Sequence, residues 1–360
     1  MSTGLAPRWA SAPGETIRAI LVERQLSIDY LAAALEAPLN EAEALLAGQA
    51  TISAERAAQL SRALGASARF WLTREAEYAE DRTRVEAADW SGSLPLASMR
   101  RLGWIRATRD WRDEIDQCLG FFGVDDFEEW LDRYPKQTQN ARYRTSTAHP
   151  NDDNATLVWF RAGDVEAGRS RPGRTFDAGA LRKSVPALRA LTRIGDPERF
   201  IPDLKRFTAR CGLTVVVVPA PEGCRASGAT RWENGTPIVQ LSARYLSDDH
   251  FWFTFFHELG HVLAQDQRHQ TYVDIDLDSG THDHAESEAD EFAESALLGG
   301  ARLAEVRHDT PRNVVRTAVR LGVSPGILVG QLQHREILGR EQLNGLKRRY
   351  RWEGERLVAK

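Results

Sequence analysis

The stretch FWFTFFHELGH, residues 251–261, joins an aromatic run to the pattern H-E-x-x-H. On a helix, side chains four residues apart lie on one face, so His257 and His261 can present two imidazole nitrogens to one metal ion. Glu258 then lies beside the open coordination position that a hydrolytic zinc site requires. The pattern also arises by chance in a chain of 360 residues, so the surrounding sequence decides between a hydrolase and an accidental match.

The size and composition of the chain describe a globular protein of two or three domains. It has 360 residues, of which 42% are hydrophobic and 27% charged, and it can bury a core of ordinary size. The formal net charge of −4 excludes a chain that coats nucleic acid along its whole length. Three irregularly spaced cysteines favour a reducing compartment. Without a signal-like start or an apolar run of about 18 residues, the expected location is cytoplasmic, with no membrane partner.

A catalytic zinc site needs a third protein ligand. The residues after His261 do not continue the Gly and His pattern of a metzincin, which leaves the gluzincin arrangement, where a Glu comes from a second helix. Residues 284–298, HAESEADEFAESALL, supply such a helix. Glu286 lies one turn before its expected buried stripe and is the predicted ligand, with Glu288 as the alternative. Asp290, four residues after Glu286, can accept the second ring N–H of a zinc-bound histidine.

The stretch before the motif changes from helical to strand-like periodicity. Residues 213–218 and 237–242 are rich in β-branched side chains and predict two strands, and residues 228–232 predict a third. Asn234-Gly235 predicts a two-residue hairpin between the last two strands. We expect a small antiparallel sheet lying against the helix that carries the metal motif.

Several short segments around the motif form a recognisable set. They are Gly228-Ala229-Thr230, Leu241-Ser242, residues 249–261 and Glu286-x-x-Ala289-Asp290-x-Phe292-Ala293. Over residues 205–300 this set resembles the ImmA/IrrE metallopeptidases. The resemblance implies a zinc-dependent endopeptidase that cleaves a repressor or antitoxin protein, with Glu258 as general base. The alternative is a DNA-binding regulator or antitoxin in which the zinc site is structural or inactive.

Cys224 lies in the loop before residue 228. Its thiolate is a candidate inhibitory fourth ligand of the zinc, released by oxidation or by substrate. The alternative is an ordinary loop cysteine without a role at the site.

Residues 15–75 predict a run of short helices, with Ser27 and Ser53 as N-caps. The motifs Pro13-Gly14-Glu15, Gly48-Gln49, Ile52-Ser53, Ala57, Leu60 and Phe70-Trp71-Leu72 resemble the HigA-like branch of the lambda-repressor-type (XRE) helix-turn-helix family. That resemblance implies DNA binding through the helix near residues 39–46, but this helix offers few side chains for base edges. Residues 15–72 carry five Arg and no Lys against seven Asp and Glu, a net of −2, so dimerisation or docking of a partner protein is favoured over operator binding.

The C-terminal tail predicts two helices, residues 312–321 and 326–338, joined by a turn. Residues 312–351 hold nine Lys and Arg against two Glu, a net of +7. The densest part supplies four candidate contacts to a nucleic acid such as single-stranded DNA: Lys347, Arg348, Arg349 and Arg351. A solubilising face, or a surface that holds the acidic N-terminal domain, is the alternative.

The expected fold class is therefore α+β and mainly helical. The predicted parts are an N-terminal helix-turn-helix domain (1–82), a helical middle region (83–205), a zincin-like, gluzincin-type peptidase domain with a small β-sheet (206–305) and a helix-turn-helix-like basic tail (306–360). The expected cofactor is Zn²⁺. The expected partners are a protein substrate, DNA in single-stranded or operator form, and a second copy of the chain in a homodimer.

Overall fold

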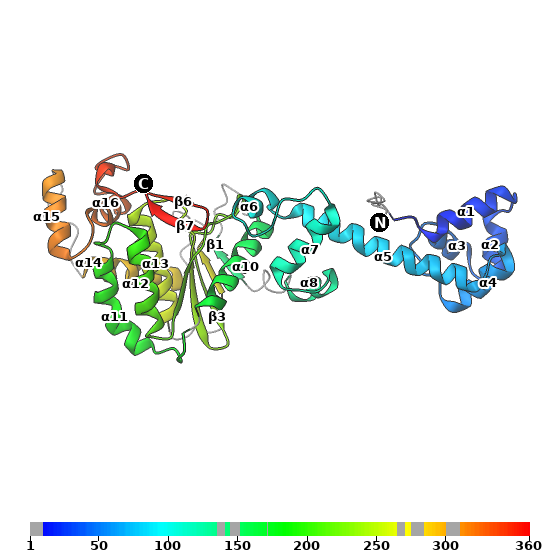
Figure 1. Ribbon diagram of the computed structural model, residues 1–360, viewed down its shortest axis with the longest axis horizontal. Helices are drawn as coiled ribbons and strands as arrows, with labels where there is room; N and C mark the ends of the chain where they lie inside the picture. Colours follow the sequence, from blue (N-terminus) through cyan, green and yellow to red (C-terminus); the bar gives the residue numbers. More distant parts are fainter. Residues whose placement is uncertain are drawn as a thin grey trace. The chain divides into compact units, whose positions relative to one another are not determined.

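The computed structural model describes residues 10–134, 141–144, 152–170, 172–264, 271–274, 284–299 and 310–360, with the backbone alone for 141–144 and 271–274. The chain divides into two compact units, Met1–Ser93 with Thr108–Cys118, and Leu94–Ala107 with Leu119–Lys360. The described part is mainly helical with small sheets (Figure 1), which agrees with the expected α+β class.

Four short helices and one long helix, α5, make up most of the described part of the first unit. They are α1 (Pro13–Glu23), α2 (Ile28–Ala34), α3 (Leu39–Leu46), α4 (Ala54–Leu64) and α5 (Ala68–Ser93). The predicted caps are confirmed, because the hydroxyls of Ser27 and Ser53 accept backbone N–H bonds at the starts of α2 and α4. Helix α5 runs through residue 82, the predicted end of the first domain. Trp71, at its start, is fully buried in the core of this unit.

The second unit contains the sheet and the metal motif. Its helices are α6 (Leu96–Arg101), α8 (Phe127–Arg133), α10 (Asp153–Arg169), α11 (Ala178–Leu191), α12 (Pro197–Ala209), α13 (Asp248–Leu263), α14 (His284–Leu298), α15 (Pro311–Leu321), α16 (Pro325–His334) and the short 3-10 helix η2 (Asn344–Leu346). Its strands are β1 (Ala141–Arg144), β2 (Thr214–Val217), β3 (Gly228–Glu233), β4 (Thr236–Leu241), β5 (Thr271–Asp274), β6 (Tyr350–Glu353) and β7 (Arg356–Ala359). Helix α7 (Trp111–Phe122) begins in the first unit and ends in the second.

The main sheet has the strand order β1-β5-β3-β4-β2. The three predicted strands and the hairpin at Asn234-Gly235 are confirmed, and both turn residues have positive φ, as a tight hairpin turn requires. The expected antiparallel pairing is confirmed for β3 with β4, but the expectation is wrong for β2, and the sheet is mixed. In the sheet, β4 lies between β3 and β2, and β2 pairs with β4 in parallel. Strand β1 also pairs with β5 in parallel. Strands β1 and β5 have four residues each, too few for a clear periodicity in the sequence.

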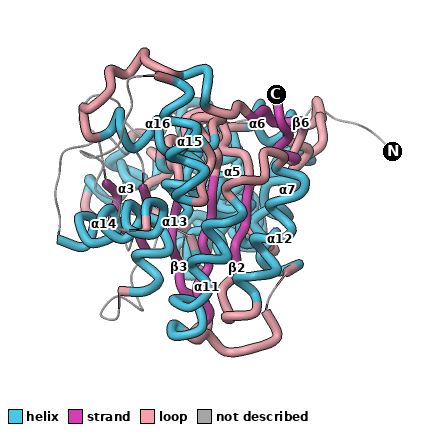
Figure 2. The backbone as a smooth tube through the Cα atoms, turned by 90° about the vertical axis from the view of Figure 1, so that its left-hand side faces the viewer, coloured by secondary structure: helices cyan, strands magenta, loops and turns pink. Residues whose placement is uncertain are grey.

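The two faces of this sheet carry different cores. Along β2, Val215 faces a core shared with α11, α12, α13 and α14, while its neighbour Val216 faces a second core that includes Trp159 of α10. Figure 1 shows α10 on one side of the sheet and α11 to α13 on the other, and Figure 2 views the sheet from the side of α11, α13 and α14. The metal motif therefore lies in the inner layer of the second unit.

Helix α13 is buried along nearly its whole length. It packs against β3, β4, α14 and α16, and side chains of its aromatic run, such as Trp252, Phe255 and Phe256, are fully buried. A helix that is apolar on all sides is stable only inside a protein. The aromatic run thus anchors the metal motif in the core.

The start of α13 is tied to the C-terminal part of the chain. Asp248 accepts the hydroxyl of Ser324 through Oδ2 at 2.7 Å and the backbone N–H of Arg348 through Oδ1 at 3.0 Å. Asp249 Oδ2 forms a buried ion pair with Lys347 Nζ at 2.6 Å. Carboxylates are favourable at a helix N-terminus because of the helix dipole. Residues 310–360 therefore help to position the helix that carries the metal motif.

These contacts correct part of the predicted nucleic-acid surface. The Lys347 side chain is only 8% exposed, and the Arg348 guanidinium donates to the backbone carbonyls of residues 192 and 193 at 3.1 and 3.0 Å. Both side chains act within the fold, because Lys347 is paired with Asp249 and the Arg348 guanidinium is hydrogen-bonded to backbone carbonyls. Arg349 lies at the surface and Arg351 is 51% exposed, so their nucleic-acid contacts stay a prediction.

The tail itself is a helix pair followed by a hairpin. Helices α15 and α16 are joined by a turn with Gly322 in the left-handed conformation and Ser324 as the next N-cap, as the sequence predicts. Helix α16 ends at His334, earlier than expected, and strands β6 and β7 then form an unpredicted two-stranded sheet. None of the described helices is long and apolar enough to cross a membrane.

Candidate metal centre

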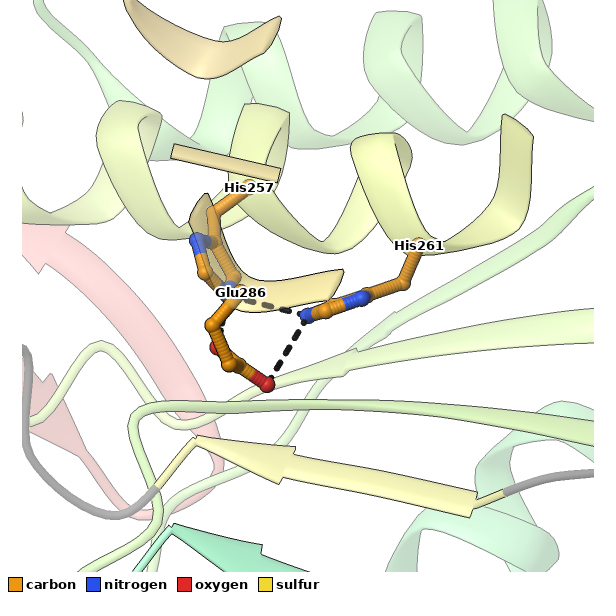
Figure 3. A group of neighbouring side chains, drawn as sticks. All are labelled: His257, His261 and Glu286. Carbon is orange, nitrogen blue, oxygen red and sulfur yellow. Dashed lines mark hydrogen bonds and ion pairs between the residues drawn. The ribbon is translucent and has the colours of Figure 1, made fainter. Parts of the chain in front are cut away.

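Two turns of α13 carry the three residues of the H-E-x-x-H motif. His257 and Glu258 are fully buried, and His261 is 3% exposed. The Nε2 atoms of the two histidines lie 3.1 Å apart. Figure 3 shows both rings pointing toward Glu286. The helical spacing thus brings together two imidazole nitrogens that can bind one metal ion, as the motif predicts.

Helix α14 supplies the remaining polar groups. Glu286 Oε2 lies 3.2 Å from His257 Nε2, and Glu286 Oε1 lies 3.5 Å from His261 Nε2. One turn further on, Asp290 Oδ1 lies 2.8 Å from His257 Nδ1. The structure therefore brings together the predicted ligand set and the predicted supporting carboxylate.

The position of α14 depends on a close contact between small residues. A methyl group added at Gly260 would lie 2.8 Å from the Cα and 3.2 Å from the Cβ of Ala289. The two helices can approach this closely only because residue 260 has no side chain. Glu286 and Asp290 flank Ala289 on α14, so this contact determines how far they reach toward the histidines.

Replacing Gly260 by Ala is expected to separate the two helices at the metal centre. We expect a loss of about 1–3 kcal/mol in the free energy of unfolding, as in other overpacked cores, and a weakening of metal affinity by about tenfold or more. Chemical denaturation and metal titration by calorimetry measure the two effects. Gly168→Ala is the matched control, because a methyl group at this position on α10 would contact nothing within 4 Å. Equal metal affinity in both variants would contradict the role of Gly260.

The donor atoms fit a tetrahedral metal ion. His257, His261 and Glu286 each offer one ligand atom, and these atoms lie within 4.8 Å of one another. A zinc ion with bonds of about 2.0–2.1 Å holds its ligand atoms about 3.3 Å apart, close to the 3.1, 3.2 and 3.5 Å found here. With Nδ1–H of His257 donating to Asp290, the lone pair of Nε2 is directed at the centre.

The charge states of the cluster also suit a cation. Burial disfavours ionisation of Glu286, but its interactions with the rings of His257 and His261 outweigh burial and hold the pKa of this carboxyl well below its usual range. Burial lowers the pKa of His261, so its ring is neutral near pH 7. An ionised carboxylate and a neutral imidazole are the forms in which these groups bind metals.

Glu258 lies in a tight pocket between α13 and β3. The hydroxyl of Thr230 donates to Glu258 Oε2 at 2.6 Å, and both side chains are buried. A methyl group at Gly228 would lie 2.4 Å from Glu258 Oε1. Gly228 and Thr230 are two residues apart on β3 and so face the same side of the sheet. They fix the carboxylate beside the metal ligands.

Residues 213–333 match the peptidase M78 family, described as the IrrE N-terminal-like domain. The match runs from the start of β2 into α16, and it includes every residue of the cluster. It supports the ImmA/IrrE resemblance and indicates a metallopeptidase-type function. A search of curated proteins finds no match.

The structure also distinguishes between the two candidates for the third metal ligand. Glu286 lies in the cluster, whereas the Glu288 side chain is 57% exposed and lies 3.5 Å from the still more exposed His284. Tyr272, His269, His282 and His284 are sequence candidates for assisting at the scissile carbonyl; the side chains of the first three lie outside the described residues. Gly228, Thr230 and Gly260 were part of the family resemblance, but their contacts with Glu258 and α14 appear only in three dimensions.

Cys224 does not have the properties of an inhibitory ligand. It lies with Ala155, Trp159 and Ala226 in the core on the α10 side of the sheet. Burial raises the pKa of its thiol to about 11, so the thiolate that a zinc ligand requires is disfavoured. This corrects the prediction of a thiolate switch. Cys224 is a core residue of the second unit.

Proposed function

We propose that this chain is a zinc-dependent endopeptidase that hydrolyses a peptide bond in a regulatory protein, a repressor or an antitoxin. The convergence of His257, His261 and Glu286 beside the buried Glu258 carries this proposal. The match to the IrrE N-terminal-like domain supports it, since that family is a peptidase family. The substrate class follows the ImmA/IrrE resemblance of the sequence.

His257, His261 and Glu286 would hold the ion, and Asp290 would fix the ring of His257. When bound, zinc would polarise the scissile carbonyl and lower the pKa of a coordinated water to about 7. Glu258 takes the proton of the attacking water and returns it to the leaving amine. We assign this transfer to Oε1, because Oε2 already accepts the Thr230 hydroxyl.

Replacing Thr230 by Val is expected to lower kcat by about tenfold or more while KM and zinc content stay nearly constant. The change removes one hydrogen bond to a charged group, which is worth about 1.5–3 kcal/mol, but keeps the β-branched shape. Steady-state kinetics separate kcat from KM, and Thr230→Ser, which keeps the hydroxyl, is expected to recover most of the rate. If Val and Ser variants have the same kcat, the hydroxyl does not hold the base.

A cleavage test on candidate substrates examines the proposed function directly. The zinc-loaded chain is incubated with each repressor or antitoxin encoded beside its gene, and the products are identified by mass spectrometry. We expect one new cut in one protein, and its loss after removal of the metal by a chelator. A chain that binds zinc but cuts none of these proteins would contradict the proposal.

We propose that the first unit recognises the partner or the signal, as a homodimer or by docking another protein. The exposed face of its α3 carries Leu39, Asn40, Glu41 and Glu43. A face with two carboxylates and an apolar side chain favours a protein surface over DNA phosphates. Loss of substrate cleavage, but not of zinc, on reversing the charge of Glu43 would support this role.

A second candidate function is binding of DNA, with the zinc site structural. Arg312, Arg316 and Arg320 are exposed along one face of α15 at four-residue spacing, which favours contact with a polyanion. Such binding weakens steeply as salt rises. A DNA-binding chain without any protease activity toward neighbouring gene products would favour this function over the first.

A further inference from the structure

A pocket of about 580 Å³ lies beside the N-terminal half of the metal-motif helix, outside the metal cluster. Helix α13 contributes His250 and Phe253, and helix α16 contributes Gln331 and His334. The Phe253 ring lies 6.3 Å from the ring of His257 and 5.9 Å from that of His334. Phe253 therefore forms the boundary between this pocket and the metal centre.

The charges that line the pocket favour an anionic group. Three cations, Arg340, Lys347 and Arg349, face two anions, Asp249 and Glu336, so the lining has a net charge of +1 before protonation of either histidine. Lys347 and Asp249 neutralise each other in their buried ion pair. Arg349 is exposed and has no ion pair within the described residues.

The pocket also contains a buried hydrogen-bond acceptor. Gln331 is 4% exposed, and its Oε1 has no hydrogen-bond partner among the described residues. Buried polar atoms normally find partners. A ligand that carries both N–H donors and a carboxylate would complement Gln331 and Arg349 together, and a peptide with an acidic side chain has both.

The distance between the pocket and the metal centre determines which residue of a bound substrate enters the pocket. Phe253 and His250 precede His257 by four and seven residues, which is about 6 and 10 Å along a helix axis. An extended peptide advances about 3.3 Å per residue. A substrate whose scissile bond lies at the metal centre thus reaches the pocket with a side chain two or three positions from the cleaved bond.

We propose that this pocket is a specificity subsite that receives an acidic side chain, Asp or Glu, two or three residues from the scissile bond of the substrate. The proposal rests on the proposed endopeptidase function. Arg349 is the residue that selects the charge, and Phe253 separates the bound side chain from the metal ligands.

The test compares the zinc-loaded full chain with Arg349→Glu and with Arg351→Glu. Arg351 is a matched control, because it is exposed, lies two residues away and does not line the pocket. Each protein is incubated with a pool of peptides from digested total cell protein, and the cut sites are identified by mass spectrometry. Equal zinc content and equal circular dichroism spectra verify that the variants are folded.

The unchanged chain and Arg351→Glu are expected to enrich Asp and Glu two or three positions from the cut. In Arg349→Glu the ratio of acidic to basic residues there is expected to fall about five- to tenfold, because one partly exposed charge pair changes from attraction to repulsion. Cleavage by the unchanged chain without an acidic preference, or with a preference that survives Arg349→Glu, would overturn the subsite and leave the proposed function standing.

A binding measurement keeps the two proposals separable. Fluorescein-labelled hexapeptides of alanine, with Glu or with Lys at the third position, are titrated with the zinc-loaded Glu258→Gln variant, alone and combined with Arg349→Glu. We expect tighter binding of the Glu peptide and loss of this preference in the double variant. If the unchanged chain cuts no peptide but this preference is seen, the proposed function fails and the anionic site remains. Equal binding of both peptides would refute the site itself.

Discussion

Replacing Glu258 by Gln is expected to leave zinc bound and to lower the rate of peptide hydrolysis by about 10²–10⁴-fold, the range that a general base contributes. The three atoms that converge on the metal position come from His257, His261 and Glu286, so the substitution removes no ligand. It removes the carboxylate that accepts the proton of the attacking water. The rate should fall in kcat, because proton transfer belongs to the transition state.

The variant should also remain folded. Gln has nearly the same shape as Glu, and the Thr230 hydroxyl at 2.6 Å can either donate to or accept from an amide group. Gly228 leaves room for this group as it does for the carboxylate. The melting temperature and zinc content of the variant should therefore stay close to those of the unchanged chain.

Single-turnover cleavage of the identified protein substrate, with zinc content measured on the same sample, checks this expectation. Glu291→Gln is the matched control, since Glu291 is exposed on α14 away from the cluster, and it should cleave at the normal rate. Undiminished cleavage by the Glu258 variant would show that another group is the base. Loss of zinc together with activity would instead assign Glu258 a structural role.

The sequence predicted the local parts of this site because they depend on short spacings. His257 and His261 meet because four residues make about one helical turn. Asp290 could be predicted from the same rule, because it follows Glu286 by four residues and His257 Nδ1 needs an acceptor. The hairpin at Asn234-Gly235 is a property of two adjacent residues.

The features that the sequence did not predict depend on contacts between distant segments. Gly260 is close to α14 only because Ala289 is opposite to it, and no spacing rule connects these two residues. Lys347 looked like part of a basic surface because the sequence does not reveal that Asp249 is its partner 98 residues earlier. The parallel pairing of β2 with β4 likewise follows from the order of strands in space.

The prediction for Cys224 was wrong for the same reason, because it depended on spatial contacts rather than on a short spacing. Its loop is short and close in sequence to Gly228, which contacts Glu258. Strand residues alternate between the two faces of a sheet, however, and the chain before β3 lies on the α10 side, where Cys224 packs against Trp159 and its neighbours. Cys224 is therefore close to β3 in the sequence, but its thiol lies on the opposite face of the sheet from Glu258.

Replacing Glu286 by Gln is expected to weaken zinc binding by more than about 100-fold. The loss of a group that only supports a ligand already costs about 10–100-fold, and a neutral amide is a poor substitute for a carboxylate bound to zinc. The carboxylate of Glu286 is held in its ionised form by its interactions with both histidine rings, which keep its pKa low despite burial. The amide cannot carry this charge at any pH.

The same substitution two residues along the helix separates the two candidate ligands. Glu288 is 57% exposed, lies 3.5 Å from His284 and is not part of the cluster. Glu288→Gln should therefore bind zinc within about twofold of the unchanged chain, as surface substitutions usually have small effects. Competition with a chelating dye measures the affinities. A second readout is thermal: zinc should raise the melting temperature of the unchanged chain and of Glu288→Gln, but not of Glu286→Gln, because only a bound ligand stabilises the folded state. The opposite pattern would make Glu288 the third ligand. Helix α14 would then have to rotate about its axis by more than half a turn, which the close contact of Ala289 with Gly260 opposes.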